Sequence, residues 1–101
     1  MESSDPLLKY ENEIMAICFG SKDKWLEVSY LCQDDWVECK NGLYDFYTLF
    51  TDNNIKIEPI MLTSVFLTYY GLITEKIKIE KESVEKLENI FRKILEELEV
   101  D

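Results

Sequence analysis

Hydrophobic side chains recur at helical spacing near both ends of the chain. Asp5 and Pro6 suit the N-cap and first position of a helix, and apolar residues follow every three or four positions: Leu7, Tyr10, Ile14 and Ile17. Near the C-terminus, Ser83 suits an N-cap and precedes a longer stripe of the same spacing: Val84, Leu87, Phe91, Ile94 and Leu98. The pattern predicts a helix that ends at Gly20 and an amphipathic helix at the C-terminus.

The middle of the chain, residues 43–73, has two apolar stretches separated by a polar turn. Residues 43–51 favour a helix, and the Asp-Asn-Asn run at 52–54 ends it because Asn tolerates the left-handed conformation. Pro59 suits the start of a second helix and Gly71 its C-terminal cap. Two helices joined by a short connector have the outline of a helix-turn-helix.

Other segments favour extended structure. Residues 55–57 suit a short extended piece, and residues 75–80 alternate strictly, with Ile77 and Ile79 on one side. Such alternation predicts an edge strand or the wing of a winged helix. Residues 25–32 fit both the period of a strand and that of a helix; their helical surroundings favour a helix, and a strand stays open.

Turn-like pairs follow at residues 34–35, Asp-Asp, and at 41–42, Asn-Gly. The chain of 101 residues suits one domain with one core, spanning residues 1–101. We therefore expect a small α+β domain that is mostly helical, with a winged-helix-like centre and a C-terminal amphipathic helix.

Three stretches of the middle segment carry a resemblance to a known family: residues 43–50, 53–57 and 66–73. Together they resemble the C-terminal winged-helix domain of phage- and poxvirus-type primase-helicases. The resemblance implies a winged-helix fold, in which the second helix normally carries lysines or arginines. Here no Lys or Arg lies between Glu58 and Glu75.

The charge balance argues against nucleic acid as the partner. The formal net charge is −10, from 21 acidic and 11 basic residues, and Arg92 is the sole arginine. Phosphate neutralisation supplies most non-specific affinity for nucleic acid, and Arg is the residue best suited to bidentate phosphate contacts. We expect nucleic-acid binding to be disfavoured and a basic protein partner to be favoured.

The residue types for most catalytic chemistry are missing. The chain has no histidine, so Ser-His and Cys-His nucleophile pairs are impossible. Its three glycines, at 20, 42 and 71, cannot build a phosphate-binding loop. The three cysteines, at 18, 32 and 39, match no metal-binding spacing and favour buried free thiols. We predict no enzyme activity, no metal and no cofactor.

The expected location is cytoplasmic. An odd number of cysteines suits a reducing compartment, and the acidic N-terminus lacks the basic start of a signal peptide. The longest uncharged run, Pro59–Thr74, has sixteen residues and is short for a membrane span.

Aromatic and acidic residues interleave between residues 25 and 52, where Lys40 is the sole basic residue. Aromatic anchors ringed by acids suit an interface with a basic protein. The candidate partner-binding residues are Asp34, Asp35, Trp36, Glu38, Asp45 and Asp52. The alternative is that the aromatic rings fill the core and the acids only face water.

The favoured function is a small acidic, non-catalytic binding protein that inhibits a basic nucleic-acid-handling or toxin-like protein. By size and acidity the chain resembles small inhibitors of viruses and mobile elements, including anti-CRISPR, DNA-mimic and immunity proteins. One alternative is a winged-helix DNA-binding regulator that forms a homodimer through the C-terminal helix. In that helix four residues form either a dimer seam or part of the core: Leu87, Phe91, Ile94 and Leu98. Another alternative is an assembly module within a larger complex.

Overall fold

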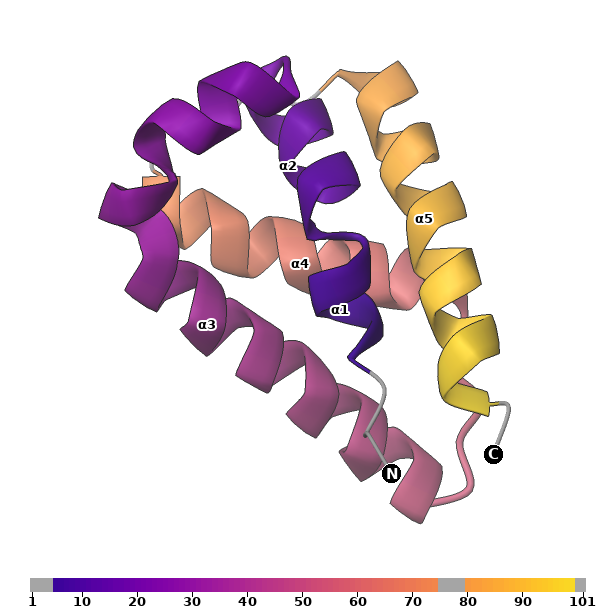
Figure 1. The fold of residues 1–101 in the computed structure, drawn as a ribbon. Helices are drawn as coiled ribbons and strands as arrows, with labels where there is room; N and C mark the ends of the chain where they lie inside the picture. The colour runs from indigo at the N-terminus through magenta and orange to yellow at the C-terminus, as the bar shows by residue number, and fades with distance from the viewer. Residues whose placement is uncertain (1–4, 75–79, 100–101) are drawn as a thin grey trace.

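The computed structural model describes residues 5–74 and 80–99, and these residues form a helical globule without a strand (Figure 1). The elements in chain order are α1 (Pro6–Lys9), α2 (Glu11–Phe19), α3 (Lys22–Asp52), α4 (Pro59–Thr74) and α5 (Lys81–Glu99). The expected α+β class is therefore wrong, and the domain is all-α.

The expected winged-helix centre is wrong as well. Residues 55–57 form an irregular connector between α3 and α4, from which Ile57 is buried in the core. Among the described residues this segment has no neighbouring strand with which to pair, so it forms no sheet. The side chain of Ile57 packs in the core all the same. The expected strand or wing at 75–80 lies outside the described residues apart from Glu80, which belongs to no helix or strand.

Helix α3 is continuous through positions where the sequence predicted turns. Residues 25–32 are helical, and the expected turns at 34–35 and 41–42 do not form. The reason is a continuous inner face, because α3 buries four residues at helical spacing: Trp25, Trp36, Cys39 and Leu43. Burial along this face outweighs the turn preference of the short polar pairs, since local propensity is a weak prior compared with tertiary packing.

Some helix ends follow the expected local chemistry and others do not: α4 continues past the expected cap Gly71 to Thr74, and α5 begins at Lys81, before the expected N-cap Ser83. The Ser21 hydroxyl caps the start of α3 by accepting a hydrogen bond from the backbone of Lys24 at 3.2 Å. At the far end Asn54 has a φ of 59°, in the left-handed region, as predicted for the polar run that ends this helix. Gly20, with a φ of 97°, ends α2.

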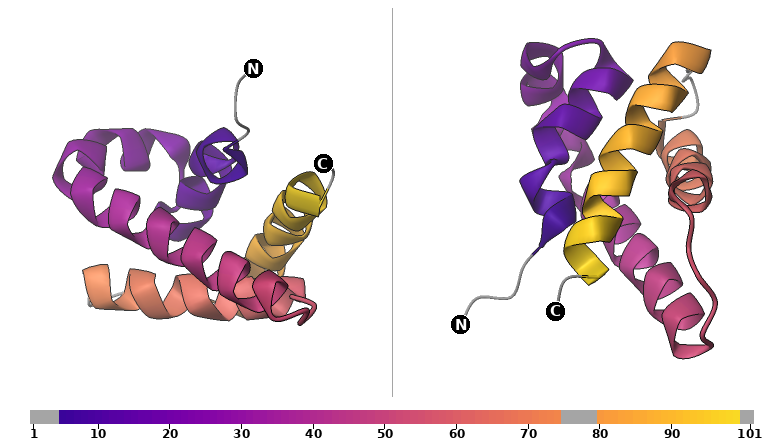
Figure 2. Two further views of the ribbon diagram at one scale, coloured as in Figure 1. Left: turned by 90° about the horizontal axis from the view of Figure 1, so that it is seen from below. Right: turned by 90° about the vertical axis from the view of Figure 1, so that its right-hand side faces the viewer.

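Helix α3 bends sharply, so that its N-terminal part lies beside α2 and its C-terminal part crosses α4 (Figures 1 and 2). Within this helix, Gly42 faces the ring of Tyr69 on α4. A Cβ atom at Gly42 would lie 2.8 Å from the ring Cζ and the hydroxyl oxygen. The absence of a side chain at Gly42 therefore allows the close approach of α3 and α4.

Aromatic rings connect the three long helices through the core. The rings of Trp36 and Phe66 meet edge to face at 6.2 Å, and those of Phe66 and Phe91 lie 5.5 Å apart. Such pairs add stability beyond the area they bury. Helix α5 lies against α4 and α2, with Leu87 and Ile94 fully buried.

The C-terminal stripe is thus occupied inside one chain. Leu87, Phe91 and Ile94 are each 0% exposed, and Leu98 is half-buried against the core. Of the two interpretations of these residues, core or dimer seam, this packing matches the core. Fully buried side chains are not available to a second copy without opening the fold.

The short N-terminal elements are tied to α3 and α5 by polar contacts. The Tyr44 hydroxyl accepts from the backbone N–H of Leu7 at 3.1 Å and donates to the carboxylate of Asp5. Helix α1 ends before Tyr10, so the predicted single N-terminal helix is divided in two. The Tyr10 hydroxyl donates to Glu97 Oε2 at 2.7 Å, and Lys9 Nζ lies 3.1 Å from the same oxygen.

Candidate functional site

The outer face of α3 carries a row of carboxylates along the length of the helix. The members are spaced by four or seven residues, and all are exposed: Asp23, Glu27, Asp34, Glu38, Asp45 and Asp52. We call this set the acidic row. Residues spaced by four and seven share one stripe of an α-helix. At 1.5 Å per residue the row follows about 45 Å of helix, but it is not straight because α3 bends (Figures 1 and 2).

Among the described residues, no ion pair neutralises the acidic row. Those residues contain the pairs Lys9–Glu97, Lys56–Glu58 and Arg92–Glu88, none of which involves the row. Like charges four apart repel, by roughly 0.2–0.5 kcal/mol per pair, and the row contains two such pairs, Asp23–Glu27 and Asp34–Glu38. The fold therefore tolerates a mild electrostatic cost along this face.

The lysines of α3 do little to offset this field. Lys22 and Lys24 lie at the first turn of the helix, beside Asp23. Lys40 is half-buried, with its Nζ 5.7 Å from the ring centroid of Trp36. The stretch from Glu27 to Asp52 is consequently the most negative part of the face.

Large apolar side chains accompany the acids on the N-terminal half of α3. Leu26, Tyr30 and Val37 are spaced by four and seven residues and are all exposed, with Tyr30 at 75%. We call these three the apolar row. Leu31 is exposed as well and lies on the other side of the acidic row, so Tyr30 and Leu31 flank it between Glu27 and Asp34. Exposed Gln33 lies between Tyr30 and Val37 on the same stripe, so the apolar row is interrupted there. Exposed apolar side chains rimmed by charge are typical of an interaction site.

The structure places most of the predicted site residues together. Asp34, Glu38, Asp45 and Asp52 belong to the acidic row. Asp35 is also exposed, but it lies one position further along the helix and so about 100° around its axis from Asp34.

Trp36 is the exception and requires a correction. Its side chain is 2% exposed and lies on the inner face of α3, where the indole N–H donates a hydrogen bond to the carboxylate of Glu11. Trp36 is therefore a core residue. This matches the alternative interpretation, in which the aromatic rings fill the core and the acids only face water.

Sequence reasoning missed part of this face. Asp23 and Glu27 extend the acidic row toward its N-terminus, and Leu26, Tyr30 and Val37 form the apolar row. The signal was present in the spacing of residues 23–52, but it becomes visible only when that stretch is taken as one helix. The expected turns at 34–35 and 41–42 concealed it.

The remaining side chains offer little for other chemistry. Burial raises the pKa of the Cys39 thiol to about 12, which keeps it protonated and unreactive near neutral pH. Among residues 5–74 and 80–99, no group of three cysteines and carboxylates gathers as metal ligands would. Arg92 is engaged on its own helix, with its guanidinium 2.6 Å from Asn89 Oδ1 and 3.4 Å from Glu88 Oε2.

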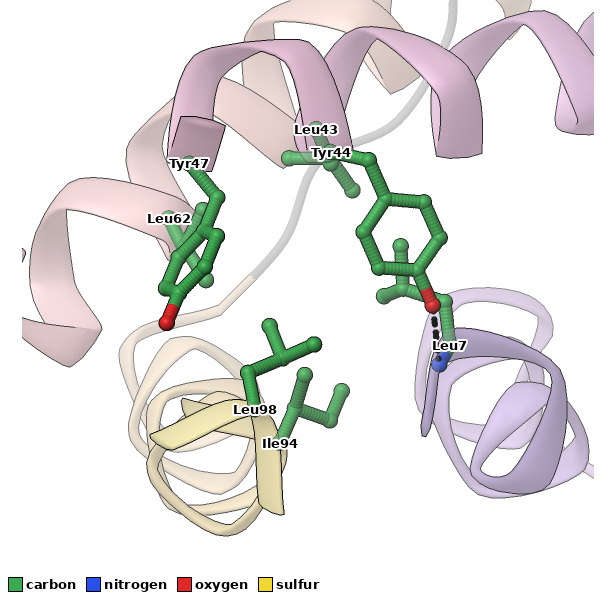
Figure 3. Close-up of a pocket in the computed structure, with 7 residues that line it drawn as sticks. All are labelled: Leu7, Leu43, Tyr44, Tyr47, Leu62, Ile94 and Leu98. Atoms are coloured by element: carbon green, nitrogen blue, oxygen red, sulfur yellow. Dashed lines mark hydrogen bonds between the residues drawn. The ribbon is translucent and has the colours of Figure 1, made fainter. Parts of the chain in front are cut away.

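A small cavity lies between the helices, as Figure 3 shows. Its volume of about 10 Å³ matches at most a single water, and its lining residues are Leu7, Leu43, Tyr44, Tyr47, Leu62, Ile94 and Leu98. The Tyr44 hydroxyl is already committed to Leu7 and Asp5. The cavity is a packing defect between α1, α3, α4 and α5 rather than a ligand pocket.

Residues 5–74 and 80–99 give little support to the DNA-binding alternative. The described residues include no strand that could form a wing, and α4, which would be the recognition helix, contains no Lys or Arg.

None of the helices in the described part of the chain combines the length and the apolar character needed to cross a membrane. Comparisons with protein-family models, with curated proteins and with solved structures gave no match to this chain.

Proposed function

We propose that this chain is a non-catalytic binding protein that inhibits a basic nucleic-acid-handling or toxin-like protein through the outer face of α3. The observation that carries the proposal is the acidic row, six exposed carboxylates along one face without an ion pair among the described residues. The apolar row beside it supplies side chains that a purely solubilising face does not need.

The two kinds of side chain have separate roles in such an interface. Unpaired surface charge of one sign steers a partner of opposite sign and accelerates association. Apolar anchors provide most of the affinity once the partner is seated, and Tyr is among the residues enriched at such positions. Tyr30, at 75% exposure, is therefore the expected anchor.

A nucleic-acid-handling partner follows from the chemistry of basic surfaces. Proteins that hold nucleic acid line their binding grooves with Lys and Arg that neutralise phosphates. The carboxylates of the acidic row carry the same negative charge as the phosphates that such a groove binds. An inhibitor of this kind acts by occupying the groove in place of the nucleic acid.

A charge-reversal experiment with a matched control tests the proposal. One triple variant reverses the acidic row at Asp34→Lys, Glu38→Lys and Asp45→Lys. The control makes the same change in net charge on α5, at the exposed residues Glu85→Lys, Glu96→Lys and Glu99→Lys. Each protein is immobilised, exposed to lysate of its native host, and its captured proteins are identified by mass spectrometry.

The native chain and the α5 control should retain the same basic protein, and the α3 triple variant should lose it. Retention of that protein by the α3 variant would contradict a role for the acidic row. Equal loss by both variants would show that only net charge matters and would also contradict the proposal.

A further inference from the structure

We propose that the partner element seated on α3 is an amphipathic helix, with an apolar stripe that packs on the apolar row and Lys or Arg residues that face the acidic row. This inference rests on the proposed function and specifies the chemistry of the partner. The geometry of the two rows and the absence of sheet edges among the described residues support it.

The apolar row has the dimensions of a helix-packing surface. Leu26, Tyr30 and Val37 span twelve residues of α3, which corresponds to about 17 Å along the helix or three helical turns. Leu26 and Tyr30 are four residues apart and form part of one ridge of the kind against which a second helix packs, and Val37 lies two turns beyond Tyr30. A partner helix of three to four turns would cover this ridge with its own apolar stripe.

The acidic row runs beside this ridge at the same spacing. Glu27, Asp34 and Glu38 cover the length of the apolar row, and all three are exposed. A helix lying on the ridge would bring residues of its adjacent stripe to these carboxylates. Cations at those positions gain both long-range attraction and pairing at the rim, whereas acids there would be repelled.

A helical partner suits this face better than an extended one. The backbone N–H and C=O groups of α3 are used within the helix, and the described residues contain no strand edge. An extended segment would therefore bury backbone groups against α3 without hydrogen-bond partners, which is costly. A helix satisfies its own backbone and needs only side-chain contacts.

Charge also argues against the other occupants of an exposed apolar face. A second copy of the chain would bring its own acidic residues to a face with an uncompensated acidic row, in a molecule whose net charge is −10. An anionic membrane surface or a nucleic acid meets the same repulsion. A cationic helix is the occupant that gains from both rows.

Synthetic peptides provide the test. The first is a fluorescein-labelled peptide of about 18 residues with leucines at helical spacing and lysines elsewhere. The second has the same composition, with its leucines scattered around the helix. Binding of each to the full chain is followed by fluorescence anisotropy, and far-UV circular dichroism checks that every variant is folded.

The amphipathic peptide should bind at least roughly tenfold more tightly than the scrambled one. The double variant Leu26→Ser with Tyr30→Ser should lose that preference. The control Leu8→Ser, on α1, should keep it, since Leu8 and Leu26 are similarly exposed, at 54% and 52%.

The failures of the inference and of the proposed function are distinguishable. Equal binding of both peptides, or an unchanged preference in the double variant, would overturn the helical partner while leaving a cation-binding acidic face. If neither peptide binds, the outer face of α3 does not recognise cationic segments, and the inference fails together with the proposed function.

Discussion

The indole N–H of Trp36 on α3 donates a hydrogen bond to the carboxylate of Glu11 on α2. This contact lies on the inner face of α3, where the Trp36 ring also meets Phe66. Successive side chains of an α-helix are about 100° apart, so residues two positions from Trp36 lie on the opposite side of the helix. Asp34 and Glu38 therefore face solvent.

Replacement of this tryptophan should affect folding and leave binding intact. Trp36→Phe keeps a ring in the core but removes the only donor of the indole, which leaves the half-buried Glu11 carboxylate without that hydrogen bond. We expect a loss of about 1–3 kcal/mol in the free energy of unfolding, measured by urea denaturation. Partner capture should persist while the variant is folded; loss of capture at unchanged stability would place Trp36 in the interface.

The contact between Gly42 and Tyr69 predicts a coupled pair of substitutions. Gly to Ala inside a helix normally stabilises by about 0.5–1 kcal/mol, but at Gly42 the new methyl group would meet the Tyr69 ring. Gly42→Ala should therefore be neutral or destabilising in the native chain and stabilising in a Tyr69→Ala background. Urea denaturation of the four proteins gives the coupling, and additive effects would contradict the contact.

Substitutions in α5 distinguish a core helix from a dimer seam. Ile94 is fully buried, so Ile94→Ala should cost about 2–5 kcal/mol of unfolding free energy, and Ile94→Glu should unfold the chain. The exposed neighbour Lys93→Ala is the control and should change little. Circular dichroism and sedimentation velocity give the fold and the mass. A folded monomer from Ile94→Glu, starting from a native dimer, would show that the stripe is an interface instead.

The contacts of Glu97 predict a pH-dependent contribution to stability. Hydrogen bonds from Tyr10 and Lys9 lower the pKa of Glu97 below its ordinary value of 4.5, because both donors favour the ionised carboxylate. A lowered pKa stabilises the fold at pH above 4.5, and that stabilisation is lost as the pH falls through the folded-state pKa.

Glu97→Gln should thus reduce stability at pH 7 and have little effect at about pH 3, as measured by urea denaturation at both values. The exposed neighbour Glu96→Gln should have little effect at either pH. A Glu97→Gln effect that is the same at both pH values would contradict the role of the ionised carboxylate.

The sequence predicted some features of the structure because their signals are local. The N-cap at Asp5 and the helix end at Gly20 depend on a few neighbouring residues, and the C-terminal stripe depends on spacing alone. The unity of α3 could not be predicted in this way. It depends on Trp25, Trp36 and Leu43 packing against other helices, which overrides the turn preference of the residues between them.

The candidate site was predictable to the extent that charge is visible in composition. Acids around 34–52 were identified, but the assignment of Trp36 to the surface was wrong because its helical phase relative to Asp34 and Glu38 was unknown. The same missing phase concealed the alignment of Leu26, Tyr30 and Val37. When residues 22–52 are treated as one helix, the burial of Trp36 and the alignment of Leu26, Tyr30 and Val37 both follow from their positions along it.

The most direct measurement of the central claim is site-specific photo-crosslinking. A photoreactive phenylalanine analogue is placed at Tyr30 in the apolar row, or at two exposed control positions elsewhere, Leu8 on α1 and Ile60 on α4. After irradiation in host lysate, the Tyr30 position should yield one crosslinked basic protein, and the controls should not. Crosslinks from Leu8 or Ile60 with none from Tyr30 would contradict binding through the outer face of α3.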